Sequence, residues 1–174
     1  MPRLLVVHHS PTGALRALTA QVLAGARDPE IEGVEVDDRP ALDFATGEAD
    51  HRDLLAADGY LLGTTANFGY MSGALKHVFD STFLQIGGAL DPSGAAGDSA
   101  GGDSTGPTTA GRPFGLYVHG RYDLTGAVRS VLSLTGALGW KQGYDVLEAV
   151  GDVGEGDLEA AYELGGTIAA LLSS

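Results

Sequence analysis

The feature that most constrains the fold is a regular alternation of short apolar runs with longer segments of helical periodicity. Short runs rich in β-branched residues are typical of strands buried on both faces of a sheet. The expected strands are residues 3–9, 33–39, 59–65, 113–120 and 143–151. Apolar residues at three- and four-residue spacings are typical of helices with one buried face. The expected helices are 12–26, a short helix or turn at 48–58, 72–86, 123–139 and 157–172. This alternation predicts an α/β fold with a parallel sheet that helices cover on both faces.

A polar segment at about residues 87–112 interrupts the alternation. It is rich in Gly, Ser, Thr, Ala and Asp and has almost nothing apolar to bury, which predicts a flexible insertion. We expect it to lie beside the site that the strand ends form. A linker between two domains is the other interpretation, but the strand–helix–strand–helix remainder would make a poor domain by itself. The 174 residues are therefore expected to form a single domain, 1–174.

Composition excludes several classes of function. The chain has no cysteine, which rules out disulfides, thiolate metal sites and cysteine nucleophiles, so any redox chemistry needs a bound cofactor. Its net charge of −13 opposes binding to nucleic acid or anionic membranes and favours a basic partner. The apolar run between Arg3 and His8 has only four residues, too few for a signal peptide or a membrane span. We expect a soluble, cytoplasmic protein.

The turn after the first strand suggests an anion site. Ligands of open parallel sheets bind where the carboxyl ends of strands meet helix N-termini, and the sequence "HHSPTGA" occupies that place. Unpaired amides and the positive end of the helix dipole suit a phosphate there. Ser10 and Thr12 can add hydroxyl donors, and Gly13 permits close approach of the backbone. The segment is neither a Walker P-loop nor a three-glycine dinucleotide motif, so a monophosphate fits best. A turn that merely caps the helix is the alternative.

Two further strand ends carry residues suited to a flat ligand. The segment "GTTANFGYMSGALKHVFDST" (63–82) places small, polar and aromatic residues before a capped helix, which offers flat side chains and bare backbone to a planar ring. The segment "YVHGRYD" (117–123) offers amides to a polar ring edge, and His119 or Arg121 can stabilise negative charge there. Inward packing of Phe68, Tyr70 and Met71, and an exposed turn without a ligand, are the alternatives.

Taken together, these three loops resemble the flavodoxin-like FMN proteins, and more closely their branch of NAD(P)H-dependent FMN reductases and tryptophan-repressor-binding-protein-type quinone reductases. The most specific similarity is between residues 63–82 and that branch's "P-T-x-F-G-x-M-S-G-x-x-K-x-F-x-D" segment. The order of strands and helices agrees along essentially the whole chain. The resemblance implies a flavodoxin-like three-layer sandwich whose five-stranded parallel sheet has the order 2-1-3-4-5.

The resemblance also implies an FMN site built from the three loops. The residues it assigns to the phosphate are Ser10, Thr12, Gly13, Ala14 and Leu15. Those along the ring are Thr64, Thr65, Ala66, Asn67, Phe68, Gly69, Tyr70 and Met71, and those at its pyrimidine edge are His119, Gly120, Arg121 and Tyr122. Two positions depart from the pattern. Ala14-Leu15 stands where flavodoxins commonly have Asn-Thr, which removes a hydroxyl donor, and Thr64-Thr65 stands where a proline is common.

The expected function is that of an FMN oxidoreductase in which the cofactor performs the chemistry and no side chain acts as acid or base. NADH or NADPH would reduce FMN or a quinone-like acceptor. The first alternative is a flavodoxin-type electron carrier that docks on a redox protein, and the second is an FMN-free binding module. We expect no nucleic-acid or membrane partner and favour a homo-oligomer.

Three other classes do not fit the sequence. A response-regulator receiver needs acidic residues after the first and third strands, where this chain has His8-His9 and Thr64-Thr65. The five histidines are scattered, so no metal site is expected. A serine hydrolase of the α/β class needs a Gly-x-Ser-x-Gly elbow, which is absent.

Overall fold

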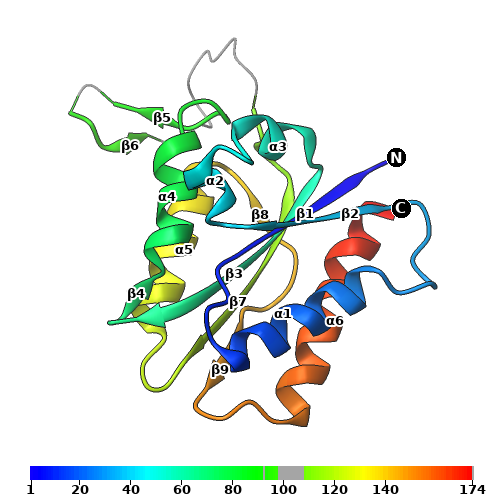
Figure 1. Cartoon of the computed structure of the whole chain (residues 1–174). Coiled ribbons are helices and arrows are strands. Elements are labelled where there is room, and N and C mark those ends of the chain that lie inside the picture. The colour runs from blue at the N-terminus through cyan, green and yellow to red at the C-terminus, as the bar shows by residue number, and fades with distance from the viewer. Residues whose placement is uncertain (92, 98–107, 174) are drawn as a thin grey trace.

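The computed structural model describes residues 1–91, 93–97 and 108–173 and has a parallel sheet at its centre (Figure 1). Its strands are β1 (Arg3–His8), β2 (Glu35–Pro40), β3 (Gly59–Asn67), β7 (Pro113–Gly120), β8 (Lys141–Gln142) and β9 (Leu147–Val150). The order is β2-β1-β3-β7-β8, with β9 also pairing with β7, and all these pairs are parallel. The expected order 2-1-3-4-5 is confirmed, since β8 and β9 together occupy the fifth position.

The fifth position differs from the single strand expected at 143–151. Lys141 lies opposite Pro113 and Leu147 lies opposite Tyr117, so this segment has two more residues than β7 over the same stretch. The extra length interrupts the pairing and leaves two short strands on one neighbour. Because β9 keeps its pairing with the last four residues of β7, the carboxyl end of the sheet keeps its regular form.

Helices cover both faces of the sheet (Figure 1). The long helices α1 (Gly13–Ala26) and α6 (Glu155–Ser173) pack together on one face. The other face carries α2 (Asp43–Thr46), α3 (His51–Ala56), α4 (Gly73–Thr82) and α5 (Thr125–Ala137). The segment expected as one helix or turn at 48–58 is thus α3, preceded by the unexpected α2, and the helix expected at 72–86 ends at Thr82. No helix within the described ranges is both long and apolar enough to cross a membrane.

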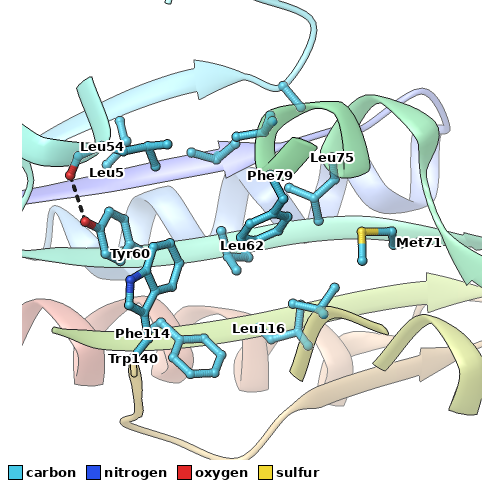
Figure 2. Close-up of a cluster of buried hydrophobic side chains, with 14 of the residues drawn as sticks. Leu5, Leu54, Tyr60, Leu62, Met71, Leu75, Phe79, Phe114, Leu116 and Trp140 are labelled. Carbon is cyan, nitrogen blue, oxygen red and sulfur yellow. Dashed lines mark hydrogen bonds between the residues drawn. The ribbon is translucent and has the colours of Figure 1, made fainter. Parts of the chain in front are cut away.

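Alternate residues of each strand feed two separate cores, as a sheet buried on both faces requires. On β1, Leu4 and Val6 join the core under α1 and α6, whereas Leu5 and Val7 face the other helices. Figure 2 shows this second core, in which the rings of Tyr60 and Trp140 stack at 3.9 Å. The sheet therefore holds the strand ends rigidly. The loops after the strands are less constrained in sequence by the two cores.

The described part of the polar segment at 87–112 lies elsewhere than expected. Its residues 92 and 98–107 fall outside the described ranges, and its described part contains a small hairpin of β5 (Ala89–Leu90) and β6 (Ala96–Gly97). This hairpin follows the end of α4 and precedes β7, at the opposite end of the molecule from the carboxyl ends of the strands (Figure 1). A segment that connects a helix to the next strand must run at the amino edge of the sheet, so the described part does not lie beside the strand-end loops.

Candidate functional site

A cleft of about 450 Å³ lies where the carboxyl ends of β3 and β7 meet the start of α1. The residues that line it are Thr12, Thr65, Ala66, Asn67, Phe68, Gly69, His119, Gly120, Arg121, Tyr122 and Asp123. A second hollow of about 490 Å³ shares Thr12, His119 and Arg121 with the cleft and extends along the first turns of α1. The two hollows form one continuous site at the strand ends, as the rule for open parallel sheets predicts.

The start of α1 presents unpaired amide groups to this site. The Thr12 hydroxyl accepts a hydrogen bond from the Leu15 amide at 3.2 Å and so caps the helix. Among the described residues, the amides of Gly13 and Ala14 have no hydrogen-bond partner. A Cβ added at Gly13 would approach only the end of the Arg16 side chain, at 3.9 Å. The backbone here is open to an anion on the positive end of the helix dipole.

A tight hairpin forms the second wall of the cleft. The end of β3 pairs antiparallel with β4 (Tyr70–Met71), and Phe68 and Gly69 make the turn with φ values of +54° and +73°. Positive φ at both turn positions is the signature of a type I′ hairpin. Phe68 is the only non-glycine residue with positive φ in the described part of the chain, and its side chain is fully exposed. An aromatic side chain is thus held out at the mouth of the cleft at some cost in backbone strain.

The hairpin is fixed from two sides. The buried Thr64 hydroxyl accepts from the Ser72 amide at 2.9 Å and donates to the Thr65 carbonyl at 2.9 Å. Gly126, in the first turn of α5, lies so close to the Gly69 carbonyl that an added Cβ would be 1.8 Å from that oxygen. Only glycine permits this approach, so α5 supports the tip of the hairpin directly.

Thr65, at the end of β3, lines the cleft and has a buried hydroxyl. Thr65 is 4% exposed, yet its Oγ1 has no hydrogen-bond partner among the described residues. An unsatisfied buried polar group of this kind costs free energy in the protein alone. Because Thr65 lines the cleft, a rotation about its Cα–Cβ bond can present this hydroxyl to a polar group of a ligand there.

The loops after β7 and β9 close the far side of the site. His119 is buried, and its Nε2 donates to the Gly151 carbonyl at 2.8 Å, which ties the two loops together. Arg121 forms an exposed ion pair of 2.6 Å with Asp152. Tyr122 is 88% exposed and lines the cleft with Phe68, from a different loop. Two exposed aromatic side chains therefore border one cleft.

The structure brings most of the expected site residues together. Twelve of them line the two hollows: Thr12, Gly13, Ala14, Thr65, Ala66, Asn67, Phe68, Gly69, His119, Gly120, Arg121 and Tyr122. The other five do not line either hollow. They are Ser10, Leu15, Thr64, Tyr70 and Met71.

Each of these five differs for a physical reason. Leu15 lies one turn into α1 and is fully buried in the core. Met71 also packs into the core (Figure 2), while its neighbour Tyr70 alternates to the outside. Thr64 uses its hydroxyl to close the hairpin. Ser10 turns its hydroxyl toward His8 and Thr19.

Several lining residues were not expected from the sequence. The loop after β9 contributes Gly151, Asp152 and Val153, and α6 contributes Leu158. The rule that selected three strand ends applies equally to this fourth one, so the signal was available in the sequence. The sequence carried no signal for the support from Gly126, because that support depends on a contact between α5 and a hairpin more than fifty positions away.

The charged groups near the site do not form a metal centre. Among the described residues, no three His, Asp or Glu side chains come close enough to hold a metal ion. The pKa of His9, beside the start of α1, is lowered by burial and secondarily by the neighbouring His8. The site is thus organised around amides, hydroxyls and aromatic rings.

Comparisons with known proteins agree with this architecture. No protein-family model matches the chain. A flavodoxin from Aquifex aeolicus is 34% identical over 91 residues, which cover 52% of this chain and 45% of that protein, so the match spans less than half of the relative. A flavodoxin from the domain Archaea superposes with a TM-score of 0.73 at 14% identity, covering 99% of both chains. Oxidised flavodoxin 1 from Bacillus cereus gives 0.70 at 15% identity, covering 95% of this chain and 96% of its own. The chain therefore has the flavodoxin-like fold.

Proposed function

We propose that this chain binds FMN in the strand-end cleft and acts as a flavodoxin-type electron carrier. The observation that carries the proposal is the pair of exposed aromatic side chains, Phe68 and Tyr122, that border one cleft from separate loops. Exposing two aromatic rings to water is unfavourable unless a flat partner covers them. The matched flavodoxins support the carrier better than the NAD(P)H-dependent reductase that the sequence suggested.

The first turn of α1 suits the phosphate of FMN. The free amides of Gly13 and Ala14 can donate to it, and the helix dipole favours its negative charge. Position 15 supplies no side-chain donor to the phosphate, because Leu15 is apolar and fully buried in the core. Binding at this end thus relies on backbone donors.

The cleft between the hairpin and the β7 loop suits the flavin ring. Phe68 and Tyr122 offer aromatic faces, and the Thr65 hydroxyl offers a polar contact that the protein itself does not satisfy. Asp123 also lines the cleft, and its carboxylate opposes added negative charge nearby. These residues hold the ring in place and influence its electron affinity.

When bound, FMN supplies a ring that accepts and releases electrons, and the protein contributes binding and electrostatics. The cleft opens directly to solvent past Phe68 and Tyr122, so a redox protein can approach its edge. The net charge of −13 favours a partner with a basic docking surface.

The test is an absorbance spectrum after the protein is mixed with FMN and desalted. We expect retained flavin absorbance that dithionite bleaches under anaerobic conditions but NADH and NADPH do not. Bleaching by a nicotinamide would instead support the reductase. A protein that retains no flavin would leave only the FMN-free binding module.

A double variant, Phe68→Ala with Tyr122→Ala, checks the placement of the ring. We expect it to lose FMN affinity by at least about tenfold, because each aromatic contact contributes roughly 1 kcal/mol. Tyr144→Ala is a matched control, since Tyr144 is a partly exposed tyrosine that does not line the cleft. Equal affinity in the double variant would place the ring elsewhere.

A further inference from the structure

A continuous chain of side-chain hydrogen bonds runs beneath the start of α1. Asp38 Oδ1 lies 2.9 Å from His8 Nε2, and His8 Nδ1 lies 2.8 Å from Ser10 Oγ. Ser10 Oγ lies 2.8 Å from Thr19 Oγ1, which lies 2.9 Å from the Tyr117 hydroxyl. The chain joins β2, β1, α1 and β7, and it passes through Ser10, in the loop that precedes the free amides.

Each hydroxyl has one proton, and this fixes which group donates in the bonds among Tyr117, Thr19 and Ser10. Tyr117 is fully buried and burial raises its pKa, so it keeps its proton. Thr19 Oγ1 is its only hydrogen-bond partner among the described residues, so Tyr117 donates to Thr19. Thr19 must then donate its own proton to Ser10. Ser10 accepts from Thr19 and has its own proton left to place.

The charge of His8 decides where the Ser10 proton goes. Asp38 is an acceptor, so His8 Nε2 carries a proton and donates to it. When the imidazole is neutral, Nδ1 carries no proton and must accept from Ser10. When the imidazole is protonated, Nδ1 donates to Ser10 instead. Ser10 Oγ then accepts twice, and its proton has no acceptor among the described residues.

We propose that His8 is a positioning residue that couples FMN binding to proton uptake by releasing the Ser10 hydroxyl to the FMN phosphate. This inference rests on the proposed function. With His8 neutral, the Ser10 proton points to His8 and only the hydroxyl oxygen faces other groups, which repels an anion. With His8 protonated, the Ser10 proton is released from His8 and can turn toward an anion bound at the start of α1, three residues farther along the chain, and a positive charge lies behind it.

Other titratable and charged groups around His8 are compatible with this role. They are Asp38 and Arg39 on β2, His9 on the same strand end, Tyr117 on β7 and Arg16 on α1. Arg39 is directed away, toward the Asp38 carbonyl and the Asp53 carboxylate. Arg16 donates to the Pro11 carbonyl and so lies over the loop from outside. The pKa of His9 is lowered by burial and secondarily by His8, which disfavours a second positive charge beside a protonated His8.

The first test compares the affinities for FMN and for riboflavin, which lacks the phosphate, between about pH 6 and pH 8, where histidine changes its charge. We expect the ratio of FMN to riboflavin affinity to rise toward low pH by about tenfold more in the wild type than in His8→Gln. The phosphate itself titrates near pH 6, but it does so equally in both proteins. His77→Gln, which removes an exposed histidine of α4, should keep the wild-type dependence.

Ser10→Ala distinguishes the effect of the Ser10 hydroxyl on FMN affinity from the direct effect of the charge of His8. We expect this variant to lose most of the pH dependence although it keeps His8. A variant that retains the full dependence would mean that the charge of His8 acts through space, and the hydroxyl mechanism would be wrong.

A second measurement avoids dependence on any variant. Nitrogen-15 NMR of the His8 ring in the wild type, recorded at several pH values without ligand, with riboflavin and with FMN, should show a larger protonated fraction with FMN than in the other two samples. If FMN binds and the protonated fraction of His8 does not rise, the positioning role is wrong while the proposed function stands. If neither flavin binds at any pH, the proposed function fails and this inference with it.

Discussion

Adjacent threonines at the end of β3 have opposite roles. Thr64 and Thr65 are both buried and both were expected along the ring. The Thr64 hydroxyl makes two hydrogen bonds that hold the hairpin, whereas the Thr65 hydroxyl makes none with the described residues, although Thr65 lines the cleft. The protein alone accounts for the first hydroxyl, and under the proposed function a bound ligand accounts for the second.

This difference predicts opposite outcomes for one substitution at the two positions. Thr65→Val should leave the free protein as stable as the wild type or stabilise it by about 1 kcal/mol, because an unsatisfied buried hydroxyl is removed. The same change should weaken FMN binding. Urea unfolding without FMN and a fluorescence titration with FMN measure the two effects. Destabilisation of the free protein would mean that Thr65 has a partner.

Thr64→Val is the matched control for stability. It leaves the Ser72 amide buried without an acceptor and should destabilise the free protein by about 1–3 kcal/mol. Similar stability changes in both valine variants would contradict the distinction between the two hydroxyls.

At this scale, the sequence predicts which loops meet but not which way each side chain points. Phe68 and Tyr122 could be expected at the cleft because they follow strand ends. Inward packing of Met71 was one of two alternatives, and the structure confirms it. The partners of Ser10 could not be expected, because they depend on packing with distant elements. The Ser10 hydroxyl is fixed through Thr19 by Tyr117, which is 98 positions from Thr19.

Among the elements, α1 and α6 approach each other unusually closely. A Cβ added at Gly25 would lie 1.9 Å from the Tyr162 carbonyl oxygen, and one added at Gly165 would lie 2.0 Å from that of Val22. The two helices therefore touch through their backbones, with a glycine from each at the contact. This contact fixes α1, whose first turn forms part of the candidate site.

Gly165→Ala should therefore destabilise the protein by about 3 kcal/mol or more, because backbone atoms cannot move aside as a side chain can. Gly156→Ala in the first turn of the same helix meets no neighbouring atom. That change should stabilise the protein by about 0.5–1 kcal/mol through helix propensity. Urea unfolding followed by circular dichroism measures both. Equal effects would mean that the helices are farther apart than described.

The alternation of elements predicted the parallel sheet, and the resemblance of the three loops to the flavodoxin-like proteins implied its order. The alternation did not predict the division of the fifth position into β8 and β9, because two extra residues between them leave no signal in apolar periodicity. The polar segment at 87–112 was expected near the site from its composition, although its place after a helix assigns its described part to the opposite edge. The order of elements along the chain therefore predicts the position of this segment better than its composition does.

The whole molecule carries a charge that acts on any anionic ligand before contact. The net charge of −13 repels FMN, whereas riboflavin is neutral and is not repelled. The free amides of Gly13 and Ala14 attract the phosphate only at short range. The long-range repulsion should therefore affect the association rate of FMN. The short-range attraction should affect its dissociation rate.

Added sodium chloride should accordingly speed the binding of FMN. Between about 10 mM and 150 mM salt the screening length falls from about 30 Å to about 8 Å, which removes most of the repulsion from the distant carboxylates. We expect the association rate constant of FMN to rise several-fold in stopped-flow fluorescence, while that of riboflavin stays constant. A rate that falls with salt would mean that the cations nearest the site, Arg16 and Arg121, determine the field an approaching anion meets. In that case the acidic surface would act on the redox partner alone.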